Sequence, residues 1–325
     1  MLQLVEAATP FLPIPASPLP SACMRGSKRS PASAVVGAIK VLAFLAATQI
    51  LLEVVVFTAL AALSARLWSR YDGRGLNLPW FLSSGLASLG VTLLVCFAFL
   101  EWIDHERWAH IRLRARHGLR LFVAGLVIAA VVVLLLTAIA VAANAVQVDF
   151  RPDPFLPAVS YVLAVLAGGF ALVLQEELVY RGYLLRTLEA SVQPSVAVVA
   201  TSLIFGLFHL TRAHVSIPGV LTIFVMGCLL AVVCIRTDSL WPSIGLHFGW
   251  NSSLYLLDFP VSGTTYPNPL LDLQYLNHSW IVGSAFGPED SILVTVVIAL
   301  LLGAALAWLP KRGGPPDAAG VDAVK

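Results

Sequence analysis

The stretch Leu174-Gln-Glu-Glu-Leu-Val-Tyr-Arg-Gly-Tyr183 places two adjacent carboxylates and an arginine inside an otherwise apolar sequence. It follows directly on the apolar run 161–174, which has the composition of a segment that lies in a lipid bilayer. An ionised side chain at that depth costs several kcal/mol unless it is paired or faces water. We therefore expect these charges to have a functional reason, and we expect other spans to bring histidines to the two glutamates.

The composition of the whole chain indicates an all-α, polytopic membrane protein. Of its 325 residues, 58% are hydrophobic and only 12% are charged, and the mean hydropathy is +0.87. Soluble domains carry about 25% charged residues, so this chain has more apolar surface than one globular core could bury. The net charge of +2 and the absence of a basic stripe argue against a nucleic-acid partner and leave the lipid bilayer as the expected surroundings.

Eight apolar segments are long enough to be membrane spans, because a spanning helix needs about 20 mainly apolar residues. The fifth and sixth are short and interrupted by Pro218 and Gly219, which is typical of helices that line a cavity. We therefore expect a bundle of about eight helices with a polar cavity in the C-terminal half. The segments are 35–63, 80–100, 119–143, 157–174, 195–210, 219–235, 240–257 and 292–309.

The regions outside these segments suggest four parts. A Pro-rich, basic tail covers 1–34 and is expected to be disordered, as is the C-terminal tail 311–325. The first spans cover 35–156 and include 101–118, which we interpret as an interfacial helix or, alternatively, a docking segment for a protein substrate. The polar clusters fall within the fourth part, 157–310.

The distribution of positive charge predicts how the chain lies in the cell membrane. Most of the 20 Lys and Arg residues fall on one side if both termini are cytoplasmic, as the positive-inside rule requires. This topology makes 175–194 a cytoplasmic loop and 258–290 an external loop that dips back toward the bilayer. It also places Glu176 near the cytoplasmic end of its span.

Helical spacing separates the roles of the two glutamates. Glu177 and Arg181 are four residues apart and can pair on one face, whereas Glu176 points about 100° away. One carboxylate is then held by the arginine and the other is left for a cavity. The alternative is a purely structural ion pair at the end of a span.

Two further clusters carry histidines. Phe205 and His209 are four residues apart, and so are His247 and Asn251, so each pair shares one helical face. A lone histidine is often a satisfied core residue, and membrane asparagines also hold helices together. The three clusters follow one another in the C-terminal half, and together they predict one shared site.

The residue types in these clusters favour hydrolysis by an activated water molecule. A carboxylate with a histidine can act as general base toward water, and a histidine with an amide can donate hydrogen bonds to a developing oxyanion. An acyl bond, most naturally a peptide bond, is the expected substrate. Two alternatives remain open: a catalytic zinc ion held by Glu176, His209 and His247, and a proton relay in a transporter.

The motifs E-E-x-x-x-R (Glu176, Glu177, Arg181), F-x-x-x-H (Phe205, His209) and H-x-x-x-N (His247, Asn251) resemble, in this order, the CPBP family of intramembrane proteases. That family includes CAAX prenyl endopeptidases and bacterial bacteriocin-processing or immunity homologues. The resemblance covers about 157–310 and extends to Gly283-Ser-Ala-Phe-Gly-Pro-Glu289 before the last span.

The resemblance implies a role for each motif residue. Glu176 and His209 would activate the water, His247 and Asn251 would form the oxyanion site, and Glu177, Arg181 and Phe205 would support them. It implies a glutamic protease with no cofactor, with zinc as the alternative. The substrate is expected to be a membrane-associated or lipidated peptide or protein, and the Ala-, Arg-, Gly- and Val-rich composition looks bacterial. A non-catalytic immunity or scaffold protein of the same fold is the alternative from another class.

One expectation concerns depth. His209 lies about 14 residues, or about 21 Å, into its predicted span, whereas Glu176 is placed near the cytoplasmic end of the preceding one. The two can meet only if the fifth helix starts later or the site lies in a deep funnel. We expect that helix to begin near Ala197 or beyond.

Overall fold

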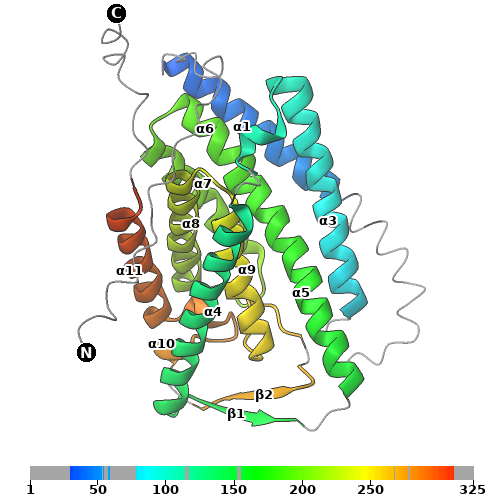
Figure 1. Cartoon of the computed structure of the whole chain (residues 1–325), viewed down its shortest axis with the longest axis vertical. Helices are drawn as coiled ribbons and strands as arrows, with labels where there is room; N and C mark the ends of the chain where they lie inside the picture. The colour runs from blue at the N-terminus through cyan, green and yellow to red at the C-terminus, as the bar shows by residue number, and fades with distance from the viewer. Residues whose placement is uncertain are drawn as a thin grey trace, which may run out of the picture.

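Long apolar helices build almost the whole structure, a computed structural model that describes residues 30–52, 54, 58, 78–113, 117–151, 155–266, 268–276 and 279–310. Within this part of the chain, 6 helical stretches are long and apolar enough to cross a membrane, and α11 is a shorter apolar helix. The expected all-α, polytopic membrane bundle is confirmed, and the protein is a multi-pass membrane protein (Figure 1).

Each of the eight predicted spans contains a helix. The helices are α1 (Pro31–Leu51), α3 (Leu78–Ala98), α4 (Gly118–Ala142), α5 (Phe155–Glu177), α7 (Pro194–Phe208), α8 (Ile217–Thr237), α9 (Trp241–Leu256) and α11 (Ile292–Trp308). The least apolar of them is α9, which also carries His247 and Asn251. Its low hydropathy fits its burial, because most of its residues are enclosed by the rest of the protein.

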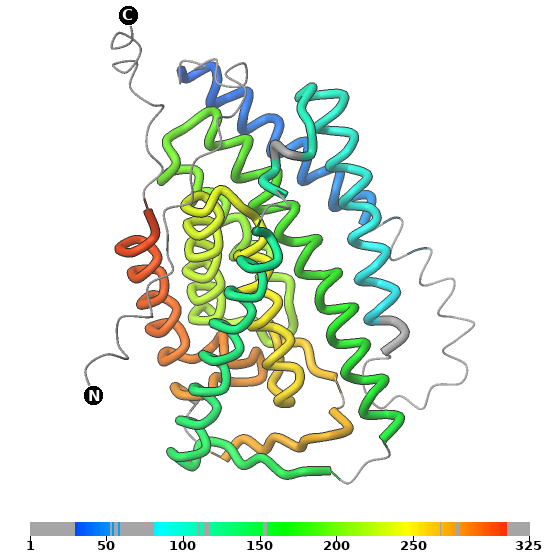
Figure 2. The backbone as a smooth tube through the Cα atoms, viewed as in Figure 1, coloured from blue at the N-terminus to red at the C-terminus, as the bar shows by residue number. Residues whose placement is uncertain are grey.

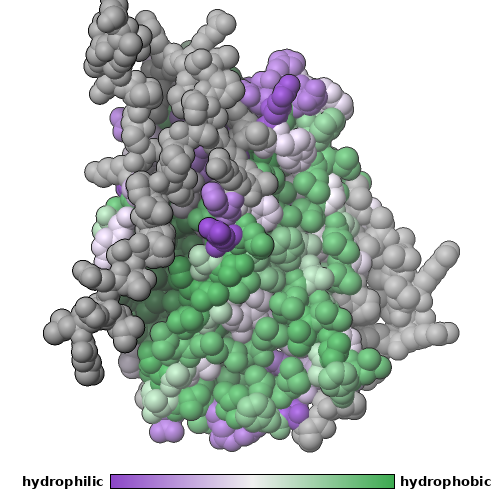
Figure 3. All heavy atoms as spheres, viewed as in Figure 1, coloured by the Kyte–Doolittle hydropathy of each residue, from purple (hydrophilic) through white to green (hydrophobic). Residues whose placement is uncertain are grey.

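The outer surface of the bundle is apolar, as a bilayer requires. Large side chains on several helices are exposed, among them Leu94 at 70%, Leu135 at 59% and Leu300 at 68%. Figure 3 shows a broad hydrophobic surface over the middle of one face, with hydrophilic residues gathered mainly toward the two ends. Exposed leucines at this density would be unfavourable in water and are favourable against lipid.

The first helix begins at Pro31, four residues earlier than predicted. Ser30 caps it: its hydroxyl accepts a hydrogen bond from the Ser33 backbone N–H, and the Ser33 hydroxyl accepts one from the Ser30 backbone N–H. Proline is tolerated in the first helical turn, because the N–H it lacks would have no partner inside the helix. Pro31 therefore starts the helix and does not interrupt it. Of the predicted N-terminal tail 1–34, residues 1–29 lie outside the described residues, and 31–34 belong to the helix and are not disordered; the predicted C-terminal tail 311–325 also lies outside the described residues.

The prediction of a loop at 175–194 is wrong. The helix of α5 continues without a break through a π-helical segment, η4 (Leu178–Leu184), and through α6 (Leu185–Ser191), giving one helical stretch from Phe155 to Ser191 (Figure 2). The charges do not end the helix because they are neutralised inside the protein, as described below. Glu176 consequently lies within a long helix and not at its end.

The fifth and sixth helices also differ from expectation. α7 begins at Pro194, so the expected start near Ala197 or beyond is wrong. Pro218 and Gly219 do not interrupt a span; they form the first turn of α8, which Ser216 caps by accepting a hydrogen bond from the Gly219 N–H. In both helices proline occupies the first turn, where it is compatible with helical geometry.

The connecting regions contain structure that the sequence did not predict. β1 (Val146–Phe150) pairs antiparallel with β2 (Leu271–Tyr275), with Val148 opposite Leu273. The segment 258–290 also holds the short helix α10 (Ser279–Val282) and a 3-10 turn, η6 (Pro288–Asp290). The region 101–118, expected to be an interfacial helix, has a π-helical turn, η2 (Phe99–Asp104), and a 3-10 turn, η3 (Trp108–Ile111).

Close packing of α4 on α9 fixes the helix that carries His247. A Cβ atom added to Gly245 would lie 2.1 Å from the Phe122 carbonyl oxygen, and one added to Gly249 would lie 2.6 Å from that of Leu126. Small residues at such positions let membrane helices approach closely. The two glycines flank His247 in the sequence, so this contact sets the height and rotation of the imidazole.

Candidate active site

Glu177 forms the fixed centre of the polar cluster. Its side chain is completely buried, and its Oε1 accepts hydrogen bonds from Arg181 Nη1 and from His247 Nδ1, each at 2.9 Å. The predicted pair of Glu177 and Arg181 is therefore present. A buried carboxylate is stable only when it is paired and hydrogen-bonded, and here a helical neighbour and a residue of α9 supply both needs.

Arg181 is equally enclosed. Its side chain is 2% exposed, Nη2 donates to the Gly227 carbonyl oxygen at 3.4 Å, and its Cζ lies 4.3 Å from the centre of the Phe205 ring. A guanidinium over an aromatic face gains cation–π attraction, which is larger in a dry setting. Arg181 thereby joins α8 and α7 to the helix that carries the glutamates.

Glu176 has a different environment. Its side chain is 19% exposed, its Oε2 lies 3.7 Å from His247 Nε2, and its Oε1 lies 3.8 Å from Arg212 Nη2. Both distances exceed that of a normal hydrogen bond, so the carboxylate is surrounded by charge without being held by it. Its oxygens remain available to another molecule.

Phe205 is the aromatic centre of the cluster. Its ring lies edge-on to the His209 ring at 4.8 Å and to the His247 ring at 6.1 Å, measured between centroids. Tyr180 contacts its edge at 4.9 Å. The ring thus separates the two imidazoles and keeps them apart on an apolar wall.

His209 follows the last residue of α7 and begins a 3-10 turn, η5 (His209–Thr211). Its Nδ1 lies 2.8 Å from the Phe205 carbonyl oxygen, which can only accept, so Nδ1 carries the proton and Nε2 is left with a lone pair. The residue is 8% exposed, and the charges of Glu176 and His247 act on its imidazole. A histidine in this tautomer can accept a proton at Nε2.

Asn251 lies one turn beyond His247 on α9 and is partly buried. Among the described residues, no hydrogen bond joins its amide to Glu176, His209 or His247. The structure therefore brings the glutamates, Arg181, Phe205 and the two histidines into one cluster, and it places Asn251 on the adjoining turn of the same helix as His247.

The helix path explains how Glu176 and His209 reach the same depth. Glu176 lies 15 residues before Ser191, the end of α6, and His209 lies 15 residues after Pro194, the start of α7. Each is therefore about 22 Å of helix from the bend that joins them. The predicted conflict in depth came from ending the helix at the glutamates, and the continuous helix removes it.

Two contacts of this cluster were not predicted from the sequence. His247 contacts both glutamates, although helical spacing was expected to separate their surroundings. Arg212 lies beside Glu176, with 3.8 Å between Nη2 and Oε1. Its position three residues after His209 is the one signal that could have pointed to it.

The zinc alternative requires Glu176, His209 and His247 to converge on one ion. Across the described residues, no three or more His, Cys, Asp or Glu side chains are arranged to hold a metal. Nδ1 of each histidine is engaged, by the Phe205 carbonyl in one and by Glu177 in the other. Histidines that bind zinc commonly donate their other ring N–H to a carboxylate or a backbone carbonyl in this way, so the zinc alternative stays a prediction.

Comparison with known protein families gives one match. Residues 157–253 match the family described as type II CAAX prenyl endopeptidase Rce1-like. The matched segment includes every residue of the cluster and covers less than a third of the chain. No curated protein and no solved structure gave a significant match.

Proposed function

We propose, from the match of residues 157–253 to the type II CAAX prenyl endopeptidase Rce1-like family, that the chain is an intramembrane endopeptidase in which Glu176 and His209 activate the attacking water. The observation that carries the proposal is the contrast within one helical turn. Glu177 is buried and held at Oε1 by hydrogen bonds from Arg181 and His247, whereas Glu176 is partly exposed and only loosely contacted. A general base needs a carboxylate of the second kind.

The first step is addition of water to the scissile carbonyl. Glu176 takes one proton from the water while the water oxygen forms a bond to the carbonyl carbon. His209 Nε2 holds the water by accepting a hydrogen bond from the other O–H. The electron pair of the carbonyl moves to its oxygen and gives a tetrahedral oxyanion. His247 and Asn251, on one face of α9, would donate hydrogen bonds to that oxyanion.

The second step is collapse of the tetrahedral intermediate. The carbon–nitrogen bond breaks as the carbonyl forms again, and the proton held by Glu176 passes to the departing amine. His247 hydrogen-bonds Glu177 through Nδ1, and in this scheme it would reach the oxyanion through Nε2. Glu177 and Arg181 are positioning residues in this scheme.

The substrate we propose is a membrane-associated or lipidated peptide or protein, because Glu176, Arg181 and His209 lie on helical stretches long and apolar enough to cross a bilayer. The family name refers to prenylated CAAX proteins, and a prenylated peptide is one member of the class to be tested. A zinc-dependent version of the protease is the alternative mechanism. Activity that persists in a strong chelator, with no zinc found by elemental analysis, would remove it.

The test is cleavage of an internally quenched, lipid-anchored peptide by the full chain in lipid nanodiscs. Glu176→Gln is expected to lower kcat by about 10²–10⁴, the usual worth of a general base, with little change in melting temperature. Glu101→Gln is the matched control, because Glu101 is exposed on η2 and outside the cluster.

Two results would contradict the proposal. If Glu176→Gln cleaves as fast as the unaltered protein, Glu176 is not the base. If the unaltered protein binds such peptides but cleaves none of them, the chain is a non-catalytic binding protein of the same fold, as in an immunity or scaffold role.

A further inference from the structure

Arg212 contacts Glu176, and the proposed mechanism gives it no part. It follows directly on the helical stretch Pro194–Thr211, which is long and apolar enough to cross a membrane. Ionised residues at membrane depth are costly unless they are paired or face water, and they commonly mark the path of a substrate. The side chain of Arg212 is 48% exposed, so enclosure by the protein does not account for its charge at this place.

The guanidinium of Arg212 keeps its capacity to donate hydrogen bonds. Its Nη2 lies 3.8 Å from Glu176 Oε1, which exceeds a normal hydrogen bond, and among the described residues the guanidinium donates to no acceptor. By contrast, Arg181 donates to Glu177 at 2.9 Å. A guanidinium has five N–H groups in a planar fork that fits a carboxylate. Arg212 can therefore take an acceptor from outside the chain, whereas Arg181 is already engaged.

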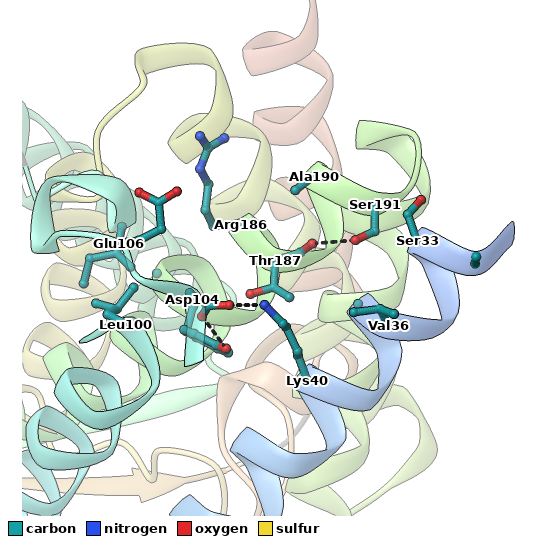
Figure 4. Close-up of a pocket in the computed structure, with 15 residues that line it drawn as sticks. Ser33, Val36, Lys40, Leu100, Asp104, Glu106, Arg186, Thr187, Ala190 and Ser191 are labelled. Carbon is teal, nitrogen blue, oxygen red and sulfur yellow. Dashed lines mark hydrogen bonds and ion pairs between the residues drawn. The ribbon is translucent and has the colours of Figure 1, made fainter. Parts of the chain in front are cut away.

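A polar cavity beside the long helix lies apart from this site. It has a volume of about 500 Å³ and lies between α1 and the η4–α6 part of that helix. Figure 4 shows Lys40 reaching from α1 to Asp104, with which it forms an ion pair, and the Tyr183 hydroxyl donates to the same carboxylate at 2.8 Å. None of the proposed catalytic residues lines this cavity. Its lysine is paired and outside the active site, whereas Arg212 borders the reacting groups.

The surroundings of Arg212 include buried aromatic rings. Its charge acts on the His209 imidazole and on the hydroxyl groups of Tyr180, Tyr255 and Tyr266, so all four groups lie near it. The three tyrosines are buried, whereas Arg212 is exposed. A hydrogen bond is stronger beside such apolar material than in bulk water. A carboxylate bound here would therefore gain more than one bound by an arginine on an open surface.

The distance to Glu176 limits where on the substrate such a carboxylate can be. A hydrogen bond of about 2.8 Å, added to the 3.8 Å between Nη2 and Glu176 Oε1, places a carboxylate on that nitrogen within about 7 Å of the proposed base. An extended peptide rises about 3.3 Å per residue, so this span corresponds to about two residues. An endopeptidase cleaves inside a chain that continues on both sides. The carboxylate is then an acidic side chain and not the end of the chain.

We infer that Arg212 is a specificity-determining residue, which binds the carboxylate of an aspartate or glutamate within about two residues of the scissile bond. The inference rests on the proposed function, because it takes Glu176 as the position of the reacting carbonyl. The guanidinium would then lie between the carboxylates of the substrate and of Glu176, and it would offset their repulsion.

The experiment compares glutamate with its neutral amide in the substrate. The full chain in phosphatidylcholine nanodiscs is given internally quenched, lipid-anchored peptides with an amidated C-terminus. Each of the two positions on either side of the cleaved bond carries Glu or Gln in turn, and mass spectrometry identifies the cleaved bond. At the position that reaches Arg212, kcat/KM is expected to be about tenfold higher for Glu, the worth of one charge-assisted hydrogen bond. In Arg212→Gln this ratio is expected to fall to about one.

Two further variants separate recognition from structure. Arg212→Lys keeps the charge and loses the planar fork, so it is expected to retain part of the preference for Glu. Arg151→Gln is the matched control, because the Arg151 side chain is 44% exposed and pairs with Asp272 outside the cluster. It is expected to keep the full preference. A purely structural role of Arg212 would instead lower kcat/KM for the Glu and Gln peptides alike, and this result would overturn the inference.

Two other results would also overturn it. In the first, the preference for Glu survives in Arg212→Gln. In the second, the unaltered protein shows no preference among amidated peptides and gains one only when the C-terminus is free, which would assign Arg212 to the end of the chain.

Binding of the same peptides, measured by fluorescence anisotropy against empty nanodiscs, distinguishes this inference from the proposed function. If no peptide is cleaved but Glu peptides bind about tenfold more tightly than Gln peptides, and only when Arg212 is present, the role of Arg212 stands and the endopeptidase proposal fails. Cleavage that shows no preference for Glu at any of the four positions would leave the endopeptidase proposal standing and overturn the role of Arg212.

Discussion

Glu176 and Glu177 are neighbours in the sequence, and each lies beside an arginine, yet the two pairs differ in almost every physical respect. Glu177 and Arg181 have 0% and 2% of their side chains exposed, and a 2.9 Å hydrogen bond joins them. Glu176 and Arg212 have 19% and 48% exposed, and 3.8 Å separates them. Burial, and not residue type, divides the carboxylate that is held in place from the one that is only loosely contacted.

The difference follows from the rotation of one residue along a helix. Consecutive residues point about 100° apart, so Glu177 faces α8 and α9 inside the bundle while Glu176 faces the turn that carries Arg212. A buried ion pair is costly to break because the remaining partner becomes an unpaired buried charge. An exposed pair is worth little because water and salt replace it.

The largest effect is expected from breaking the buried pair. Arg181→Met leaves Glu177 as an unpaired buried charge and should destabilise the protein by about 3–5 kcal/mol, measured as a loss of thermal stability in detergent. Arg151→Gln is the control, because the pair of Arg151 and Asp272 is exposed and should contribute less than about 1 kcal/mol. Equal stability of the two variants would contradict the contrast between buried and exposed pairs.

A third carboxylate sharpens the comparison, because Glu289 is buried without an arginine contact of the kind that Glu177 has. Burial raises its pKa from 4.5 to about 7, although the Ser262 backbone N–H donates to it at 3.2 Å and acts in the opposite direction. The folded state therefore keeps a proton that the unfolded state releases near pH 4.5. Stability should be greatest below that pH and fall as the pH rises to about 7, by up to about 3 kcal/mol.

Glu289→Gln is the variant that tests this pH dependence. The amide does not ionise, so the slope of the unfolding free energy between about pH 4.5 and pH 7 should decrease relative to the unaltered protein. Unfolding measured across this range gives the slope directly. An identical slope in the variant would assign the pH dependence to other groups.

The smallest effect is expected at the exposed pair. Arg212→Gln should change stability by less than about 1 kcal/mol, and the difference should shrink further in high salt. Melting curves at low and high ionic strength measure both quantities. If Arg212→Gln destabilised the protein as much as Arg181→Met, the exposed and the buried ion pair would contribute equally to stability, which would contradict the expected difference between them.

The sequence predicted the parts of the fold that depend on local composition. All eight apolar segments contain helices, and the i, i+4 spacing of Glu177 and Arg181 predicted their pair. Helix ends were less accurate wherever charge or proline was taken as a stop. The helix passes through Glu176 and Glu177 because Arg181 pairs with the buried one and His247, 70 residues further on, adds a second hydrogen bond to it. Local pattern predicted the first partner and contains no information about so distant a second one.

Most residues of the candidate site were predicted from the sequence, but several of the contacts among them were not. The motif spacing placed Glu176, His209 and His247 in one group, and their catalytic roles remain predictions. Arg212 was missed because its contact with Glu176 depends on where α7 ends, which apolar periodicity does not define to within a turn. The two strands were missed because β1 and β2 are 5 residues each and lie far apart in the sequence.

The π-helical segment Leu178–Leu184 has a consequence for insertions and deletions in the chain. Such a segment is equivalent to an α-helix with one extra residue, taken up within a single widened turn. Deleting one residue there would restore regular α-helical winding and leave α6 in place. Regular winding without a deletion would instead rotate everything beyond the segment by about 100° relative to the glutamates. Glu176 and Glu177 would keep their places, while Tyr183 would leave Asp104 and α6 would turn away from α1. The extra residue therefore sets the rotation between the two parts of one continuous helix. It lets the glutamates on one part and α6 on the other keep their contacts at the same time, which regular winding of the same residues would not allow.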